Sequence, residues 1–306
     1  MPEIEISVII PTYNRADFLK RNLSSIINQK FPKNKYEILI CDDGSTDKTR
    51  QVVHDLIKKY HQQKIKYFYQ KNSGPAACRN LGIKRARGKI IAFTDDDCRP
   101  NSDWLIQIEN SFRKHGDIFG VGGVTYTQRA KVTPLTCQIE NTHEWSFPTC
   151  NVAYKKSILE KIGGFDSKFP ATNEDADISW RVQKKGKIAH DSKMRVLHPP
   201  RKATFTGEIR GVRYLESEFF LLEKMPEEYR KRRVNPYREL FYWYGLRLGA
   251  KRIVKGFPWL FKSPLIYLQL TALIMCQRIY LIMLVPGFIY RHHKRKAQSA
   301  KPKASV

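Results

Sequence analysis

The 306-residue chain has a formal net charge of +26 and 42% hydrophobic residues. This length and apolar content suffice for one large domain or two smaller ones, and they exclude a wholly disordered chain. A charge this positive predicts an anionic partner, such as nucleic acid, a membrane surface or a phosphorylated substrate. The six cysteines are scattered along the chain, a pattern typical of buried thiols in a reducing cytosol.

Strands and helices alternate along the first third of the chain. Four apolar runs predict buried strands at residues 6–11, 36–41, 65–69 and 90–93. Helical periodicity fills the intervals at residues 16–29, 48–60 and 74–87. This order predicts an α/β fold with a doubly wound, mostly parallel sheet, in which the carboxyl ends of the strands share one edge.

Three consecutive carboxylates, Asp95, Asp96 and Asp97, follow the fourth strand. Ligands of open α/β sheets gather at this edge, and adjacent carboxylates stay ionised most easily around a hard cation such as Mg²⁺ or Mn²⁺. A polar turn, or a helix cap served by Asp97 or Ser102, explains the same residues without a metal.

Polar residues also stand near the other strand ends. Tyr13 can stack on a nucleobase, Asp43 can accept a hydrogen bond from a base N–H, and Arg79 offers a guanidinium fork for phosphate. Each also has an ordinary structural explanation: a filled core edge, a tight turn and a solvated helix charge, respectively. The motifs that surround these residues decide between the two interpretations.

Six short motifs occur in the order and spacing of one known family. They are VIIPTYNR at 8–15, ICDDGSTD at 40–47, GPAACRNLGI at 74–83, FTDDD at 93–97, GGFD at 163–166 and NEDADISWRVQKKG at 173–186. With these motifs the chain resembles glycosyltransferase family 2, the inverting enzymes of GT-A fold, from about residue 4 to residue 198. The resemblance implies transfer of a sugar from a nucleotide-sugar donor. A UDP-sugar is expected, with GDP- and dTDP-sugars as alternatives.

The resemblance also places five residues around the donor nucleotide. Thr12, Tyr13 and Asp43 match positions that bind base and ribose. Arg79 and Asp96 match positions beside the nucleotide.

The same motifs imply a metal site and a catalytic base. Asp95 and Asp97 match the metal-binding pair, with Asp97 the more direct ligand, and their Mg²⁺ or Mn²⁺ would bridge the two donor phosphates. His198 matches a position where some members add a metal ligand, and a structural histidine is the equally weighted alternative. Asp175 matches the general base that deprotonates the acceptor hydroxyl, with Glu174 as the alternative.

The region around the base is less informative. Residues 174–181 predict a helix that starts with acids, which keeps one acid near the cleft. Residues 104–115 predict a helix and residues 118–126 a glycine-containing strand. Residues 136–151 are expected to line the sugar and acceptor side.

The composition changes at Arg201, and from this residue to the end 22 basic residues face 7 acidic ones. Residues 213–233 predict a helix, and residues 237–261 interleave aromatic and basic side chains, as nucleic-acid-binding and membrane-surface proteins both do. Residues 265–290 are long enough to span a bilayer, although Arg278 weakens insertion. This segment favours a membrane partner over nucleic acid, with a buried core helix as the alternative.

The sequence therefore predicts four parts. They are a GT-A catalytic domain at 1–205 (donor half 1–97, acceptor half 98–205), a basic aromatic helical extension at 206–262, a membrane-associated segment at 263–290, and a basic disordered tail at 291–306. The segment at 263–290 is expected to be peripheral, re-entrant or single-span.

The predicted function is inverting sugar transfer at the cytoplasmic face of the cell membrane, to a lipid-linked or cell-surface glycan acceptor and without a nucleic-acid partner. A nucleotidyltransferase of similar fold is one alternative, but PTYNR stands where its glycine-rich phosphate loop would be. A non-catalytic basic protein that binds membrane or nucleic acid is the other, and it leaves both acidic clusters unexplained.

Overall fold

The computed structural model describes residues 3–133, 135–137, 139–141, 147–169, 172–204, 213–232, 253–254 and 256–276, and positions 279, 283, 287 and 290. The chain divides into two compact units. The first comprises Met1–Lys131, Gln138–Phe169 and Glu174–Pro200; the second comprises Val132–Cys137, Pro170–Asn173 and Arg201–Val306. The predicted boundaries at 205, 262 and 290 stay predictions, and the expected tail at 291–306 lies outside the described residues.

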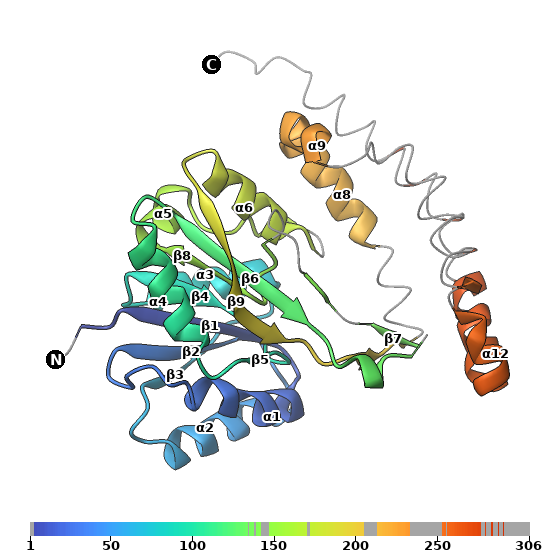
Figure 1. Cartoon of the computed structure of the whole chain (residues 1–306), viewed down its shortest axis with the longest axis horizontal. Helices are drawn as coiled ribbons and strands as arrows, with labels where there is room; N and C mark the ends of the chain where they lie inside the picture. The colour runs from blue at the N-terminus through green and yellow to red at the C-terminus, as the bar shows by residue number, and fades with distance from the viewer. Residues whose placement is uncertain are drawn as a thin grey trace. The chain divides into compact units, whose positions relative to one another are not determined.

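The first unit contains an eight-stranded sheet in the order β3-β2-β1-β4-β8-β6-β9-β5 (Figure 1). Four neighbouring strands are parallel and confirm the predicted ones: β1 (Ile6–Thr12), β2 (Tyr36–Asp42), β3 (Ile65–Tyr69) and β4 (Ile90–Phe93). The other half is mixed. It contains β8 (Val152–Lys155), antiparallel to β4 and to β6 (Gly120–Tyr126), then β9 (Ile188–Leu197), parallel to β6, and β5 (Arg99–Pro100), antiparallel to β9.

Six helices pack on the two faces of this sheet, because strands buried on both faces alternate their side chains between two cores. Val8 and Ile10 join one core with residues of α1 (Ala16–Ile27), α2 (Thr49–Lys59) and α4 (Trp104–Lys114). Ile9 joins the other with residues of α3 (Pro75–Arg85), α5 (Lys156–Lys161) and α6 (Glu174–Gln183). The fold is the predicted α/β fold with helices on both faces of the sheet. The antiparallel pairs of β8 and β5 make half of the sheet mixed, which was not predicted.

The strand ends that carry the predicted site residues meet at one edge of the sheet. Thr12 pairs with Asp42 at the ends of β1 and β2, and the amide of Asp43 donates to the carbonyl of Thr12 at 2.9 Å. Pro11 has no N–H to donate, but it lies beyond the last β1–β4 pair, Ile9 with Phe93, so no bond to β4 is lost.

The second unit contains α8 (Arg213–Lys224), α9 (Pro226–Arg232), α12 (Pro258–Lys262) and a short ladder between β7 (Thr136–Cys137) and β10 (Arg201–Lys202). The single helix predicted at 213–233 was wrong: it forms two helices, because Pro226 lacks the N–H that would continue α8, and starts α9 instead.

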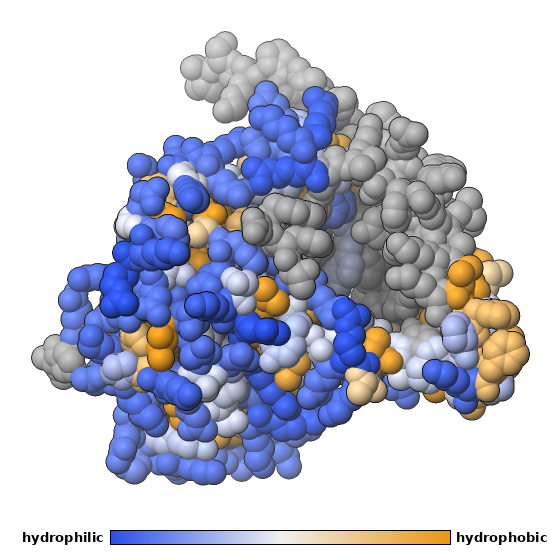
Figure 2. Space-filling model, in the orientation of Figure 1, coloured by the Kyte–Doolittle hydropathy of each residue, from blue (hydrophilic) through white to orange (hydrophobic). Residues whose placement is uncertain are grey.

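Residues 264–276 form a helix that exposes apolar side chains. Leu265, Leu268 and Met275 are more than half exposed, whereas Leu270 and Ile274 are buried. Phe261 of α12 is also exposed, and Figure 2 shows the hydrophobic surface over α12. Within the part of the chain that is described, no helix is both long enough and apolar enough to cross a bilayer.

Candidate functional site

The acidic turn after β4 is buried and paired with a guanidinium group from the loop after β1. Arg15 Nη1 donates to Asp96 Oδ1 at 3.0 Å and to Asp97 Oδ2 at 2.9 Å. Thr12 Oγ1 donates to Asp96 Oδ2 at 2.8 Å, and Asn22 Nδ2 donates to the Asp96 carbonyl at 3.0 Å. The end of β1 and the start of α1 therefore fix the shape of the turn.

Burial also affects the electrostatics of this turn. It raises the pKa of Asp96 to about 6, while the Arg15 charge opposes the rise and the Asp97 charge adds to it. Near neutral pH the Asp96 carboxylate is still mostly ionised, and Arg15 provides the positive charge that keeps it so.

Asp95 connects the turn to the start of α6 through Arg79. Arg79 Nη2 donates to Asp95 Oδ1 at 3.1 Å, and Nη1 donates to Glu174 Oε1 at 2.9 Å. The Arg79 side chain is only 6% exposed. Burial alone would lower the pKa of Arg79, but the two carboxylates outweigh it and raise that pKa above its ordinary value. This pairing brings together three of the predicted motifs.

The two candidate bases differ in their surroundings. Glu174 is buried, and its burial raises the pKa of its carboxyl although the Arg79 charge opposes this. Asp175 is half-buried, and its Oδ1 accepts a hydrogen bond from the Ala176 amide at 2.8 Å. The charge of Asp175 also acts on Arg79, so both acids lie near the guanidinium group at the first turn of α6.

Asp43 holds the loop that precedes α3. Its Oδ1 accepts from Gln70 Nε2 at 2.6 Å and from the Ser73 amide at 2.9 Å, and its Oδ2 accepts from the Gly74 amide at 2.8 Å. Gly74 has φ of +89°, a conformation that favours glycine. A carboxylate has about four acceptor positions, so Asp43 can shape this loop and still accept one bond from a base.

Tyr13 is 46% exposed at the end of β1. The next residue, Asn14, has φ of +52°, and its Oδ1 accepts from the amides of Thr46 and Asp47. The loop after β1 is thereby tied to the loop after β2, and the Tyr13 ring remains accessible to a stacking partner.

His198 lies buried directly after β9, where its amide donates to the Tyr126 carbonyl. Its Nε2 is 3.8 Å from Asp97 Oδ1, and Cys98 Sγ is 3.6 Å from the same oxygen. The three ligand atoms lie within 4.8 Å of one another. The carboxylate and imidazole donors fit a divalent cation such as Mn²⁺. Arg15 donates to Asp97 Oδ2, whereas Asp97 Oδ1 faces Cys98 and His198.

The structure therefore places most of the predicted residues in two ion-pair groups that the backbone of the acidic turn connects. Arg79 joins Asp95 to Glu174, and Arg15 joins Asp96 to Asp97. The sequence reasoning assigned no role to Arg15. The sequence does contain a feature that points to Arg15: this residue ends the PTYNR motif and is the first basic residue after β1.

Comparison with known proteins gives matches to a sequence family, to individual proteins and to solved structures. The sequence model of the family described as "Glycosyl transferase family 2" matches residues 7–165, just over half of the chain. The chain is 37% identical over 184 residues to glycosyltransferase AglE of Haloferax volcanii, covering 57% of this chain and 59% of that protein. It is 34% identical over 126 residues to a poly(ribitol-phosphate) beta-glucosyltransferase of Bacillus spizizenii, covering 39% of this chain and 20% of that protein. It thus spans less than two thirds of these relatives.

Solved structures share the fold across nearly the whole chain. The mannosyltransferase PcManGT from Pyrobaculum calidifontis, in complex with GDP-Man and Mn²⁺, superposes with a TM-score of 0.62 and 18% identity, covering 93% of this chain and 87% of that one. S. aureus TarS 1–349 superposes with a TM-score of 0.60 and 18% identity, covering 99% and 94%. The fold expected from the motifs is confirmed.

Proposed function

The chain belongs to glycosyl transferase family 2, and we propose that it is an inverting, metal-dependent enzyme that transfers a sugar from a nucleotide-sugar donor to a lipid-linked or cell-surface glycan. The observation that carries this proposal is the network in which Arg79 bridges Asp95 at the sheet edge and Glu174 at the start of α6. The network brings the acids of the donor side and the acceptor side into one site.

The donor is proposed to lie along the ends of β1, β2 and β4. Tyr13 offers an exposed ring for stacking on the base, and Asp43 offers its remaining acceptor position to a base N–H. TarS has been crystallised with UDP-GlcNAc and PcManGT with GDP-Man. We infer a UDP-sugar as the donor, with a GDP-sugar as the alternative.

Mg²⁺ or Mn²⁺ is proposed to bind Asp97 Oδ1, with Asp95 and His198 as further ligands. When bound, the cation would supply positive charge to the leaving nucleoside diphosphate. Arg15 has a separate part in this proposal: it neutralises Asp96 and the other Asp97 oxygen, which keeps the turn ionised and correctly oriented before any donor arrives.

Asp175 is the base that the surroundings favour. A base needs a carboxylate within reach of the acceptor hydroxyl, and Glu174 already accepts from Arg79 in a buried position. Glu174 then serves as a positioning residue that fixes the first turn of α6, and the half-buried Asp175 takes the proton from the acceptor hydroxyl as that oxygen attacks the anomeric carbon.

Product analysis tests the proposed reaction. The purified chain is incubated with Mn²⁺, candidate acceptors and a panel of nucleotide-sugars, and the released nucleotide is identified by chromatography. Release of nucleoside diphosphate with inversion at the sugar is the expected result. Release of pyrophosphate would instead indicate a nucleotidyltransferase, and no turnover of any donor would refute enzymatic sugar transfer by this chain.

We further propose that the second unit contacts an anionic membrane peripherally at its cytoplasmic face. The exposed Phe261, Leu265 and Leu268 provide apolar side chains, and the basic excess after Arg201 provides attraction to anionic lipid. Cosedimentation with anionic vesicles should fall in a Phe261→Ser, Leu265→Ser, Leu268→Ser variant and persist in Tyr69→Ser, which removes an exposed aromatic from the first unit. Equal binding by both variants would refute the apolar contact.

A further inference from the structure

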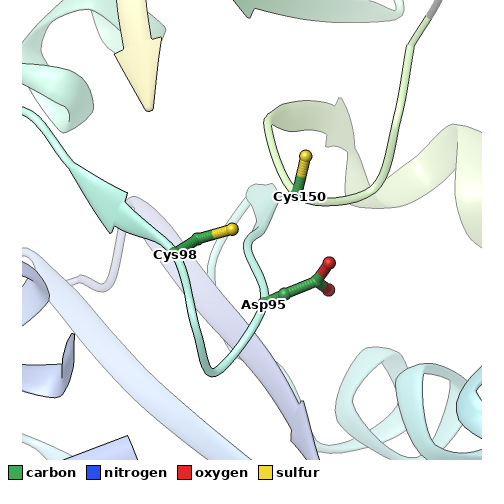
Figure 3. A group of neighbouring side chains, drawn as sticks. All are labelled: Asp95, Cys98 and Cys150. Atoms are coloured by element: carbon green, nitrogen blue, oxygen red, sulfur yellow. The ribbon is translucent and has the colours of Figure 1, made fainter. Parts of the chain in front are cut away.

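Two buried cysteines adjoin the acidic turn, and the proposed transfer uses neither of them. Cys98 directly follows Asp97, and Cys150 lies in the loop before β8. Their side chains are 0% and 1% exposed. The two sulfur atoms and an Asp95 carboxylate oxygen all lie within 4.8 Å of one another. Figure 3 shows Cys98 and Asp95 on the turn after β4 and Cys150 on the neighbouring loop.

Each of these three side chains belongs to a segment that the fold holds in place. Arg79 binds Asp95. Cys150 Sγ is 3.6 Å from the hydroxyl of Thr125 in β6. The adjacent Asn151 accepts from Trp104 Nε1 at 2.9 Å and donates to the carbonyls of Val124 and Met194. The ligand atoms are therefore brought together by the folded backbone and not by chance contacts of exposed side chains.

This donor set has two sulfur atoms, whereas the Mg²⁺ or Mn²⁺ site proposed above, with which it shares Asp95, takes carboxylate and imidazole ligands. Thiolates select soft or borderline cations such as Zn²⁺, Co²⁺ and Cd²⁺, whereas Mg²⁺ prefers oxygen ligands. Ligand atoms about 2.3 Å from a tetrahedral ion lie ~3.8 Å apart, and the three ligand atoms here lie within 4.8 Å of one another. We propose that Asp95, Cys98 and Cys150 form a second cation site that takes Zn²⁺ in preference to Mg²⁺, with the fourth position open to water.

Occupation of this site has a consequence for the neighbouring carboxylates. Both thiols lose their protons to solvent when the ion binds, and the ion engages Asp95, which otherwise accepts from Arg79. If the chain transfers sugar as proposed above, Zn²⁺ in this position inhibits transfer, because Asp95 is withdrawn from the hard-metal site. Binding itself does not depend on that function and can be measured without any donor.

The chain provides its own control. Cys41 and Cys78 are also buried thiols, and Cys78 Sγ donates to the Cys41 carbonyl at 2.9 Å. No group of possible ligands found among the described residues includes either of them. Cys137 and Cys276 are exposed, and both are replaced by serine in the test protein so that surface thiols do not contribute.

The test is a Co²⁺ titration of the full chain carrying Cys137→Ser and Cys276→Ser, reduced and under nitrogen. We expect one equivalent of Co²⁺ to give tetrahedral visible bands and a thiolate-to-cobalt charge-transfer band, both lost on adding Zn²⁺. Cys150→Ser should weaken binding at least about 100-fold, since loss of even an outer hydrogen-bond partner costs a metal site roughly 10–100-fold. Cys78→Ser should leave the spectrum unchanged. Absence of the charge-transfer band, or undiminished Co²⁺ binding in either Cys98→Ser or Cys150→Ser, overturns the proposal.

A second measurement does not depend on whether the Cys98 and Cys150 variants fold. X-ray absorption at the zinc edge, on the test protein loaded with one equivalent of Zn²⁺, should show two sulfur scatterers at about 2.3 Å and the remainder oxygen or nitrogen. One sulfur or none overturns the site. If two sulfurs are present but Zn²⁺ leaves nucleoside-diphosphate release unchanged in an active preparation, the site stands and its inhibitory consequence is wrong.

Discussion

Two isosteric substitutions at neighbouring residues separate the proposed base from the proposed positioning residue. Glu174→Gln and Asp175→Asn each replace one carboxylate oxygen with an NH₂ group. We expect the first to lower the stability of the fold, and the second to stop transfer while leaving the fold intact. The difference follows from their contacts: Glu174 accepts from buried Arg79 at 2.9 Å, whereas Asp175 is half-buried and accepts from the adjacent amide.

The magnitude for Glu174→Gln follows from the hydrogen bond to Arg79. A hydrogen bond to a charged group contributes about 1.5–3 kcal/mol. Glutamine keeps an acceptor oxygen but loses the charge. Of the two carboxylates that form ion pairs with Arg79, Asp95 and Glu174, the variant retains only Asp95. Because burial raises the pKa of Glu174, removing the charge also avoids part of a desolvation cost. We therefore expect a loss of about 2 kcal/mol, or ~4–8 °C in melting temperature.

For Asp175→Asn we expect a large change in the turnover rate and a small change in stability. Asparagine retains the oxygen that accepts from the Ala176 amide but loses the charge that acts on Arg79, so the fold should remain intact with a loss of about 1 kcal/mol or less. Loss of a general base lowers turnover by about 10²–10⁴-fold, which raises the barrier by roughly 3–5.5 kcal/mol. Donor binding should be unchanged, because the base acts on the acceptor.

The assays are melting followed by circular dichroism, donor binding by calorimetry with Mn²⁺, and nucleoside-diphosphate release in the presence of acceptor. Wild-type turnover in Asp175→Asn would remove Asp175 as the base. If Glu174→Gln abolished transfer while its melting temperature stayed unchanged, Glu174 would be the catalytic acid–base group and the positioning argument would be wrong.

Three further predictions concern the core and the metal. Glu37 is fully buried. Burial alone would raise its pKa, but hydrogen bonds from neighbouring donors lower that pKa below the ordinary carboxyl value. Glu37→Gln should therefore lower the free energy of unfolding by about 2–3 kcal/mol at pH 7. Since a lowered pKa stabilises the fold above the unfolded carboxyl pKa and is lost as pH falls through the folded one, melting curves of the variant and wild type should converge in acid. Gly82→Ala should cost about 1–3 kcal/mol by urea unfolding, because its Cβ would lie 2.6 Å from Ile9 Cγ2, whereas a Cβ at Gly116 meets no atom within 4 Å and Gly116→Ala should be tolerated. Asp97→Ala should abolish the increase in melting temperature that nucleotide plus Mn²⁺ gives the wild type, and chelation of the wild type should do the same; an undiminished increase in Asp97→Ala would refute its role as a ligand.

The parallel half of the sheet could be predicted because the local sequence of each strand, a short apolar run, indicates a buried strand. β1, β2 and β4 are apolar runs buried on both faces, and amphipathic helices separate them. The mixed half was predicted only in part: the strand expected at residues 118–126 is β6, whereas β8 and β5 were not predicted. β8 has four residues and is a strand because it pairs with β4 and β6, and β5 has two. Pairing across long sequence distances decides such strands, and local composition does not.

The candidate site shows the same division. The motifs identified the acids after β4 and at the start of α6, and strand order predicted that the strand ends would meet. The partners of these acids depend on side-chain reach. Arg15 could have remained in solvent, and nothing in its spacing showed that one nitrogen would reach both Asp96 and Asp97. Cys98 and Cys150 are far apart in sequence, and only the loop before β8 brings them together.

The charge of the site also explains why a divalent cation suits it. Arg15 and Arg79 pair with four carboxylates, those of Asp95, Asp96, Asp97 and Glu174. When all are ionised, these two arginines and four carboxylates carry a net charge of −2, and Asp175, whose charge also acts on Arg79, adds one further negative charge. A monovalent cation would leave a buried charge uncompensated, and buried unpaired charge is costly. The two arginines therefore set the charge of the cluster as well as its shape, and replacing either by a neutral side chain would change how much positive charge the cluster needs from a bound ion.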